Sequence, residues 1–420
     1  HDLQKAVSRT YRAYRTGYDS YLTGFFRSAL RRPDRQTAVQ ALQAELPFHR
    51  NVPIRFIGVW DTVDAVGMPF ALGEFVNRVI YQFKFSTQDL HQLVECGCQA
   101  LAVEEERTSF APVLWQEPAK PGQRIEQVWF AGVHSNVGGG YPKQGMSLVA
   151  LEWMLRQAMD CGLRVQRLDL ELFRGHASVD DKLYDPRAGA GVFYRWGPRD
   201  LATLCSVKGV TPKLHLTAIE RIAHGTEDYA PGGIPAGVTV VATRTGDPRA
   251  DIATEIRASA VQEVTNEALK RHPNLLQDAA RSIKLGRISY WLFMVSWLAL
   301  IIGALGVTIE TIPGPLTAGR IIKGVWTVGY SIVTLQLDVL FDTLLALVYR
   351  PWRMVGVIAF GGFLGAWWLS RRSDGRMSDI FSAFWHSQQA KLRQALKDAR
   401  LEADAHEKRQ TRPTAADGMH

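Results

Sequence analysis

Short apolar runs that each end in an ionisable side chain stand out in the first part of the chain. Ile54–Trp60 is mostly apolar and is followed directly by Asp61. Val128–Val133 is a second β-prone run, and it leads through His134 into the glycines of Gly138–Gly140. Open α/β sheets present their functional residues in this way, at the carboxyl ends of buried strands. The pattern predicts an α/β fold with a mostly parallel sheet, and it places the acid and the histidine at one rim of that sheet.

Helical periodicity surrounds these two runs. Aromatic residues recur at spacings of three and four near the start of the chain, which predicts one buried helix face formed by Tyr11, Tyr14, Tyr18, Tyr21 and Phe25. A short helix is expected over 37–46, and a helix that opens at Ser86 is expected to run toward Glu106. A further amphipathic helix, 148–161, is expected to pack behind the histidine loop through Leu148, Leu151, Leu155 and Met159, with Ala158 beside them.

The other segments of this part of the chain have weaker patterns. Residues 68–95 are apolar with aromatic side chains, which fits either a mobile lid or a cap subdomain with no gating role. Residues 163–235 are rich in loop-forming residues, and His215 within them is interpreted as structural because no glycine loop follows it. A late strand at the sheet edge is expected over 238–243, and a charged helix over 253–271.

After residue 275 the chain contains long apolar runs instead of short β-prone ones. Ile288–Ile309 contains no charged residue and is long enough to cross the hydrocarbon core of a bilayer. Met354–Ser370 is a second uncharged run, with Trp367 and Trp368 near one end. Gly324–Leu337 is also apolar but leads into two aspartates, so we expect it to be interfacial or re-entrant. The alternative is a hydrophobic helical bundle in a soluble protein.

These patterns divide the chain into three parts. We expect a catalytic-type α/β domain over 1–275, an apolar helical membrane region over 276–376, and a charged amphipathic helix with a disordered tail over 377–420. Basic residues flank every apolar run, so they set the orientation only weakly. An even number of spans leaves the first and last parts on the same, cytoplasmic, side of the membrane.

Composition and motif content argue against nucleic acid, metal ions and cofactors as partners. The net charge is +8, but the chain carries no helix-turn-helix signature, zinc spacing or aromatic–basic RNA motif, so we expect no nucleic acid partner. A basic balance beside apolar runs fits an anionic membrane surface better. The four cysteines do not form paired metal-ligand spacings and are expected to be reduced thiols. The sequence therefore predicts neither a metal nor a cofactor.

An acid after one strand and a histidine after a later strand is half of a known catalytic arrangement. In α/β hydrolases the serine nucleophile comes first, then the acid, then the histidine. The imidazole takes the proton of the hydroxyl, and the carboxylate fixes the imidazole tautomer and stabilises the imidazolium. We therefore assign Asp61 and His134 as candidate catalytic residues. Asp64 is a rival acid, but it lies inside a turn that ends at Gly67.

The motifs around both residues resemble one family. Gly58–Val63 and Gly132–Tyr141 are similar to the acid and histidine motifs of the α/β hydrolases typified by type VI secretion phospholipase effectors. Ala100–Arg107 with Phe110–Trp115, and the tyrosines of the first helix, resemble further family segments, so the resemblance covers roughly residues 1–235. It implies an α/β-hydrolase fold and a role in substrate binding or site support for Trp60, Thr62, Arg107, Ser135, Asn136, Gly138, Gly139, Gly140 and Tyr141. Family members often carry Asp where this chain has Asn136.

One family motif is absent from the sequence. The nucleophile elbow Gly-x-Ser-x-Gly does not occur in these 420 residues. Ser8 and Ser28 precede the acid but lack the flanking glycines. We therefore expect the first strands, the serine elbow and the oxyanion-hole loop to lie before residue 1, which would leave this fragment inactive alone. The alternative is a pseudoenzyme.

Two functions remain open at this stage. The first is a serine ester hydrolase for acyl lipids, with phospholipid as the substrate implied by the resemblance. The second is a catalytically inactive, membrane-anchored interaction protein on a hydrolase scaffold. A metal hydrolase using Asp61, Asp64 and His134 lacks any supporting ligand spacing. The expected location is the bacterial inner membrane, or secretion as an effector, and no immunity or secretion partner is identified by the sequence.

Overall fold

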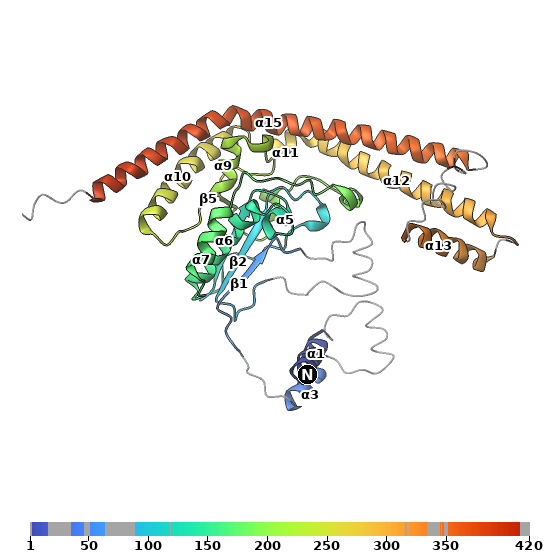
Figure 1. Ribbon diagram of the computed structural model, residues 1–420, viewed down its shortest axis with the longest axis horizontal. Helices are drawn as coiled ribbons and strands as arrows, with labels where there is room; N and C mark the ends of the chain where they lie inside the picture. The colour runs from blue at the N-terminus through green and yellow to red at the C-terminus, as the bar shows by residue number, and fades with distance from the viewer. Residues whose placement is uncertain are drawn as a thin grey trace, which may run out of the picture. The chain divides into compact units, whose positions relative to one another are not determined.

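The computed structural model describes residues 2–15, 35–45, 51–63, 89–117, 119–315, 317–333, 345, 347 and 352–411. The chain divides into two compact units (Figure 1). The first comprises His1–Gln277 together with Phe381–His420, and the second comprises Asp278–Ile380. Residues 68–88 of the predicted lid segment lie outside the described residues, as do Asp64, Tyr18, Tyr21 and Phe25.

A five-stranded parallel sheet forms the centre of the first unit, as the strand pattern predicts. Its order is β1-β2-β3-β4-β5, so each strand pairs with its neighbours in the sequence. The bounds are β1 Ile57–Trp60, β2 Cys96–Ala102, β3 Arg124–Phe130, β4 Lys213–His215 and β5 Thr239–Val241. Trp60 pairs with Ala100, and Ala102 pairs with Phe130. This register brings the residues that follow β1 and β3 to the same rim of the sheet.

Helices connect and cover these strands. In the first unit they are α1 Asp2–Arg15, α3 Arg35–Glu45, α5 His134–Gly138, α6 Gly145–Asp160, α7 Arg167–His176, α8 Leu201–Ser206, α9 Leu216–His224, α10 Pro248–Arg271 and α11 Leu275–Asp278, the last running one residue beyond that unit. Short 3₁₀ turns occupy Thr108–Phe110, Gly189–Phe193 and Thr226–Asp228. The second unit contains α12 Ala280–Thr311 and α13 Ala318–Val333, and α15 Arg353–Thr411 runs from the second unit into the first.

The core on one face of the sheet is formed by β2, β3 and α6. Alternate residues of β2, from Cys96 to Ala102, point to this face, as a strand's period of two requires. They meet Val128 and Phe130 of β3 and the buried side of α6, where Trp153 is almost fully buried. The ring of Phe130 packs edge-on against that of Trp153, with centroids 5.5 Å apart. This layer fixes the strand that precedes His134.

Three predictions about the first unit are wrong. Residues 96–102 form the strand β2 and not part of a helix from Ser86 to Glu106. Leu148, Leu151, Leu155 and Met159 of the predicted apolar face are only half-buried, and Ala158 is the one predicted residue that is buried. The buried face of α6 consists of Met146, Val149, Ala150, Trp153, Met154, Gln157 and Ala158. Tyr11 is 55% exposed on α1, so it does not contribute to a buried face. The segment 163–235 also holds more regular structure than expected, because α7, α8, β4 and α9 all lie within it.

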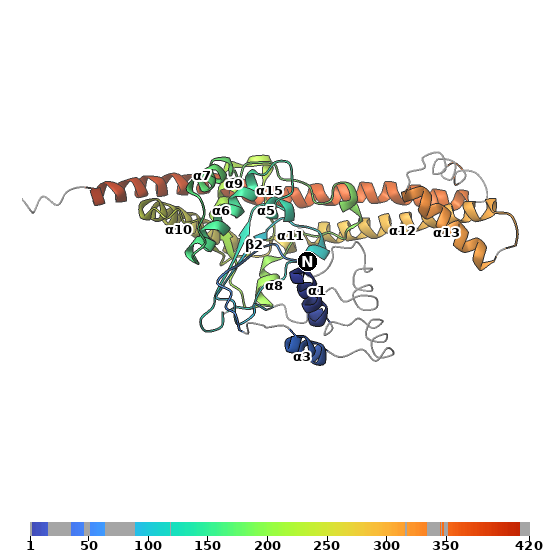
Figure 2. The same cartoon turned by 60° about the horizontal axis from the view of Figure 1, so that its bottom comes forward.

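The C-terminal part of α15 packs against the first unit. It runs alongside α9 and α10 in both views (Figures 1 and 2). Trp385 is fully buried there, and its indole N–H donates to the carbonyl of Pro231 at 2.7 Å. Arg393 donates to the carbonyl of Ala223 in α9. This amphipathic helix was predicted, but its contacts make it part of the same compact unit as the sheet.

The second unit is built on two antiparallel helices, α12 and the first part of α15. Ser373 Oγ donates to the carbonyl of Ser282 at 2.6 Å, and Ser289 Oγ donates to that of Ala366 at 2.7 Å. Residue numbers increase along α12 in the direction in which they decrease along α15, so the two helices are antiparallel. The first and last residues of this unit therefore lie at the same end of the helix pair. Both helices are long and apolar enough to cross a membrane.

The burial of Trp385 predicts that α15 stabilises the first unit. Trp385→Ala removes a fully buried indole and its hydrogen bond, so the unit should lose about 3–5 kcal/mol of unfolding free energy. Native-state hydrogen exchange of the strand amides measures this loss. Leu401→Ala is the matched control, because Leu401 is 59% exposed on the same helix and its truncation should cost no more than about 0.5 kcal/mol. Equal effects of the two substitutions would contradict the assignment.

Candidate active site

Asp61 lies at the carboxyl end of β1 in an uncommon backbone conformation. Its φ is 41°, in the left-handed region that Asp tolerates better than most residues. Its amide donates to the carbonyl of Ala100 at 2.7 Å, and the residue is fully buried. The carboxylate points across the end of β2, where the amide of Ala102 donates to Oδ1 at 3.0 Å.

His134 opens the short helix α5 directly after β3. The tight turn before it depends on Gly132, whose φ is 112° and where a Cβ would lie 2.5 Å from the Cβ of Asn136. Nδ1 of His134 lies 2.7 Å from Oδ2 of Asp61. Since an ionised carboxylate can only accept, Nδ1 carries the proton and Nε2 presents its lone pair. The structure therefore brings the two candidate catalytic side chains into direct contact.

Arg199 also belongs to this site, although the sequence analysis did not identify it. Its Nη1 donates to Oδ1 of Asp61 at 2.7 Å and its Nη2 to Oδ2 at 3.0 Å. Arg199 follows Trp196-Gly197-Pro198 in an irregular segment, where no periodicity or motif marks one arginine among many. The Trp-Gly-Pro turn that precedes Arg199 is the one sequence feature that could have drawn attention to it.

The charge of Arg199 keeps Asp61 ionised. Desolvation by burial raises the pKa of the Asp61 carboxyl, but this is outweighed by the charge of Arg199 and by hydrogen bonds from His134, Arg199 and Ala102. The result is a pKa lowered from 3.8 to about 2. Asp61 is therefore a carboxylate across the physiological pH range and can accept the Nδ1 proton of His134.

The loop after β2 supports the backbone of His134. Oε2 of Glu105 accepts from the amide of His134 at 3.3 Å, and both carboxylate oxygens of Glu105 accept from Arg107 at 2.8 Å. The guanidinium of Arg107 stacks over the ring of Phe110, 3.6 Å from its centroid, and that ring meets the imidazole edge-on at 5.4 Å. Glu105 and Arg107 therefore do not form the end of the helix predicted to run toward Glu106, but pack against the backbone and the ring side of His134.

Glu104 is a second buried carboxyl next to the histidine loop. It accepts from the amide of Gly132 and from the hydroxyl of Tyr229. Desolvation raises the pKa of Glu104 to about 8, although these hydrogen bonds and the charges of Arg221 and Arg199 lower it. Glu104 is therefore mostly protonated at neutral pH, in contrast to Asp61.

The other predicted site residues occupy different positions around the pair. Asn136 is buried and holds a neighbouring loop, since its Nδ2 donates to the carbonyl of Lys182 at 3.0 Å. Tyr141 stacks on Tyr184 with centroids 4.0 Å apart. Among the described residues, the rest lie near the pair in the sequence and form no side-chain hydrogen bond with it: Trp60 and Thr62 flank Asp61, Ser135 follows His134, and Gly138, Gly139 and Gly140 end the loop, the last two with φ of 86° and 112°.

His215 has the structural role that the sequence analysis gave it. Its two ring nitrogens are 2.8 Å from Thr217 Oγ1 and 3.0 Å from Thr243 Oγ1, and its ring stacks on Phe130 at 4.6 Å. Burial lowers the pKa of His215 to about 3, so it is neutral. Across the part of the chain that the structure describes, no cluster of three or more His, Cys, Asp or Glu side chains could hold a metal ion.

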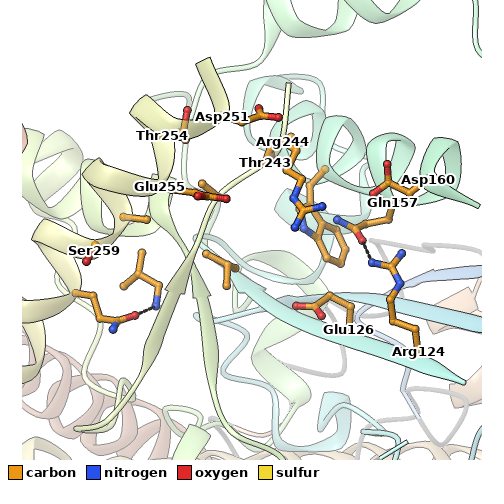
Figure 3. Close-up of a pocket in the computed structure, with 16 residues that line it drawn as sticks. Arg124, Glu126, Gln157, Asp160, Thr243, Arg244, Asp251, Thr254, Glu255 and Ser259 are labelled. Carbon is orange, nitrogen blue, oxygen red and sulfur yellow. Dashed lines mark hydrogen bonds between the residues drawn. The ribbon is translucent and has the colours of Figure 1, made fainter. Parts of the chain in front are cut away.

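A polar cavity lies elsewhere on the first unit. It has a volume of about 360 Å³ and lies between α6, β5 and α10 (Figure 3). Charged side chains of both signs line it, and Arg124 donates to Gln157 Oε1 at 2.8 Å across one wall. Neither Asp61 nor His134 borders this cavity. The chemistry of the acid–histidine pair, and not cavity size, therefore identifies the candidate site.

A parallel sheet that brings an acid and a histidine together at the carboxyl ends of its strands is the arrangement of the α/β hydrolase class. Within that class, residues 1–157 match the family model described as T6SS, phospholipase effector Tle1-like, catalytic domain. This match confirms the resemblance to type VI secretion phospholipase effectors. Comparisons with curated proteins and with solved structures gave no match. Asp61 and His134 lie inside the matched segment, whereas Arg199 lies beyond it.

The raised pKa of Glu104 predicts a pH dependence of stability. The folded protein binds this proton more tightly than the unfolded chain, so the stabilisation is fully present below pH 4.5 and is lost as the pH rises toward 8. Over that window the unfolding free energy should fall by roughly 1.4 kcal/mol per pH unit relative to the variant Glu104→Gln, which cannot ionise. Urea denaturation at a series of pH values measures the difference. Parallel pH curves for the two proteins would contradict the assignment.

Proposed function

We propose that this chain carries the acid and the histidine of a serine ester hydrolase that acts on acyl lipids, with phospholipids as substrates. The observation that supports this most directly is the 2.7 Å contact between Nδ1 of His134 and the ionised carboxylate of Asp61. The family match supports the phospholipid substrate, because it names a phospholipase effector catalytic domain. No cofactor is needed for this chemistry.

The mechanism follows from the protonation states of the pair. A serine hydroxyl attacks the acyl carbonyl while Nε2 of His134 takes its proton. The imidazolium that forms is stabilised by Asp61, whose carboxylate stays ionised. His134 then gives the proton to the leaving alcohol, and water hydrolyses the acyl-enzyme by the same route. In the proposal the serine lies in a Gly-x-Ser-x-Gly elbow outside these 420 residues, since the sequence contains none.

The exposure of His134 is consistent with this role. Its side chain is 29% exposed, whereas the Asp61 side chain is fully buried. One face of the imidazole can therefore be reached while the carboxylate is shielded from water, which strengthens its interaction with the imidazole. The alternative function, an inactive scaffold for protein interaction, requires neither an ionised acid at this position nor a partly exposed imidazole beside it.

We further propose that the second unit is embedded in a lipid bilayer. On its helix pair, polar side chains face inward and apolar side chains face outward, which is the opposite of the arrangement in a water-soluble pair. The buried residues of α12 are mostly small, and all are glycines or carry a hydroxyl: Ser282, Gly286, Ser289, Tyr290, Ser296 and Gly303. The outer surface is apolar, with exposed Ile288, Trp291, Val295, Leu298, Ile301 and Ile302 on α12 and Met354, Val357, Ile358, Phe360, Leu364, Trp367 and Trp368 on α15. Small residues inside and large apolar residues outside are typical of helices that pack in a membrane.

The catalytic assignment predicts the effect of two substitutions. In the full-length protein that includes the serine, His134→Ala removes the general base and Asp61→Asn leaves the imidazole in the wrong tautomer. Each should lower kcat for a short acyl ester by about 10³–10⁴ without unfolding the protein. Steady-state hydrolysis, with circular dichroism as the check on folding, measures this. His176→Gln is the control, since His176 is exposed on α7. Unchanged turnover in the His134 variant would refute the hydrolase.

The membrane assignment predicts that the two helices depend on close approach at Gly362. A Cβ at this position would lie 2.0 Å from Oγ of Ser296, so Gly362→Val should separate α12 from α15. Gly361→Val is the matched control, because a Cβ at Gly361 meets nothing within 4 Å. Disulfide cross-linking between cysteines at Ser289 and Ala366, in protein reconstituted into vesicles, measures the separation. Recovery of the protein in the soluble fraction, without vesicles or detergent, would contradict the bilayer assignment itself.

A further inference from the structure

The carboxylate of Asp61 has every hydrogen-bonding position filled. Oδ1 accepts from the amide of Ala102 at 3.0 Å and from Nη1 of Arg199 at 2.7 Å. Oδ2 accepts from Nδ1 of His134 at 2.7 Å and from Nη2 of Arg199 at 3.0 Å. A carboxylate offers about four acceptor sites, and Arg199 supplies half of the donors. The two terminal nitrogens of the planar guanidinium, called the fork below, each donate to one carboxylate oxygen. This bidentate contact fixes the plane of the carboxylate and keeps it ionised.

Arg199 is itself held rigidly. The same two nitrogens donate to backbone carbonyls, Nη1 to that of Ala102 and Nη2 to that of Phe110 at 2.6 Å. Arg199 is 7% exposed, and the amide of the next-but-one residue, Leu201, donates to the carbonyl of Gly233 at 3.3 Å. Arg199 therefore joins the end of β2, the loop around Phe110 and the acid that follows β1.

Removing the fork would leave Asp61 in an unfavourable state. A buried carboxylate without a compensating charge either takes up a proton or turns toward other donors. The strained backbone of Asp61, with φ of 41°, gives the side chain few alternative positions near His134. Either change would take Oδ2 away from its role as acceptor of the Nδ1 proton, and the imidazole could then adopt the other tautomer.

We propose that Arg199 is a positioning residue for the acid–histidine pair: its guanidinium holds the Asp61 carboxylate in the orientation in which Oδ2 accepts the proton of His134 Nδ1. The proposal rests on the hydrolase function proposed above for its catalytic consequence, but not for its geometry. It also extends the site beyond residue 157, because the segment that carries Arg199 lies outside the stretch that matches the family model.

Other charged groups surround the pair and must be separated from Arg199 in any test. Glu105 and Arg107 face the backbone and the ring side of His134 as a closed ion pair, and neither contacts the Asp61 carboxylate. Glu104 approaches the same turn through Gly132. Among the residues that the structure describes, Arg199 is thus the cation that forms an ion pair with Asp61, and its removal should act on Asp61 first.

A purely structural clamp would behave differently from a positioning residue. If Arg199 served only to join the carbonyls of Ala102 and Phe110, its loss would reduce stability and leave the proton of His134 on Nδ1. If it positions Asp61, its loss should change where that proton resides and should raise the pH at which the Asp61 carboxyl titrates, by between about 1 and 3 pH units.

The test uses the full chain labelled with ring-¹⁵N histidine and carboxyl-¹³C aspartate. Arg199→Met removes the charge and the fork, Arg199→Lys keeps a charge without the fork, and Arg195→Met is the control. Arg195 is an exposed arginine in the same loop whose Nε donates to Thr108 Oγ1 at 3.2 Å and not to Asp61. NMR reports which nitrogen of His134 is protonated and follows the Asp61 carboxyl as the pH is varied.

The expected result is a single Nδ1-protonated tautomer in the parent chain and in Arg195→Met, and a mixture of tautomers in Arg199→Met with a raised Asp61 titration. In Arg199→Lys the Asp61 carboxyl should still titrate at a low pH, because the positive charge is retained. His134 should nevertheless lose its single tautomer, because an ammonium group cannot donate to Oδ1 and Oδ2 in the way that the two guanidinium nitrogens do. A folded Arg199→Met with the parent tautomer and titration would overturn the proposal. If Arg199→Met does not fold, a parent-like spectrum of Arg199→Lys would overturn it in the same way.

Turnover separates this proposal from the function on which it rests. In the full-length enzyme, a positioning role predicts a fall in kcat of about 10²-fold for Arg199→Lys with KM nearly unchanged, since substrate contacts are retained. Absence of ester hydrolysis in the parent protein would refute the hydrolase function alone. The NMR result would still decide whether Arg199 orients Asp61.

Discussion

The site depends on one buried negative charge that the protein keeps ionised. Asp61 has no exposure to water, yet its pKa is lowered and not raised, because Arg199, His134 and a backbone amide replace its hydration. Glu104, also in contact with the turn before His134, forms no ion pair with any described residue, so burial outweighs the more distant charges of Arg221 and Arg199 and its pKa rises to about 8. Two carboxyls in one loop cluster therefore have opposite protonation states at neutral pH, and only one can act as a permanent acceptor for an imidazole.

The parallel register makes this arrangement possible. Because β1, β2 and β3 end at the same rim, the residues that leave β1 and β3 meet above the end of β2. The amide of Ala102, at the end of β2, contributes a donor to the carboxylate. The site therefore uses backbone from the central strand and side chains from the strands on either side, with α6 packed behind β2 and β3 to keep them in place.

The sequence predicted those parts of the structure that local patterns encode. Asp61 and His134 could be identified because each follows an apolar run, and the runs themselves became β1 and β3. β2 was mistaken for a helix because Cys-Gly-Cys-Gln-Ala-Leu-Ala lacks the β-branched residues that favour strands, whereas its pairing with β1 on one side and β3 on the other makes it a strand. The face of α6 was misassigned because apolar residues occupy more than one side of that helix. Arg199 could not be found, since its partner lies far away in the sequence and no spacing rule connects them.

The path of α15 has a consequence for how the protein is made. Trp385 packs into the first unit from the part of α15 that follows α12 and α13 in the sequence. The ribosome therefore synthesises the apolar helices before the residues that complete the first unit. During that interval the first unit lacks the hydrogen bond of Trp385 to Pro231 and that of Arg393 to α9, and the hydrophobic segment is already emerging. The unit that carries Asp61 and His134 can therefore be completed only after the whole apolar segment has been synthesised, which couples maturation of the site to the folding of that segment.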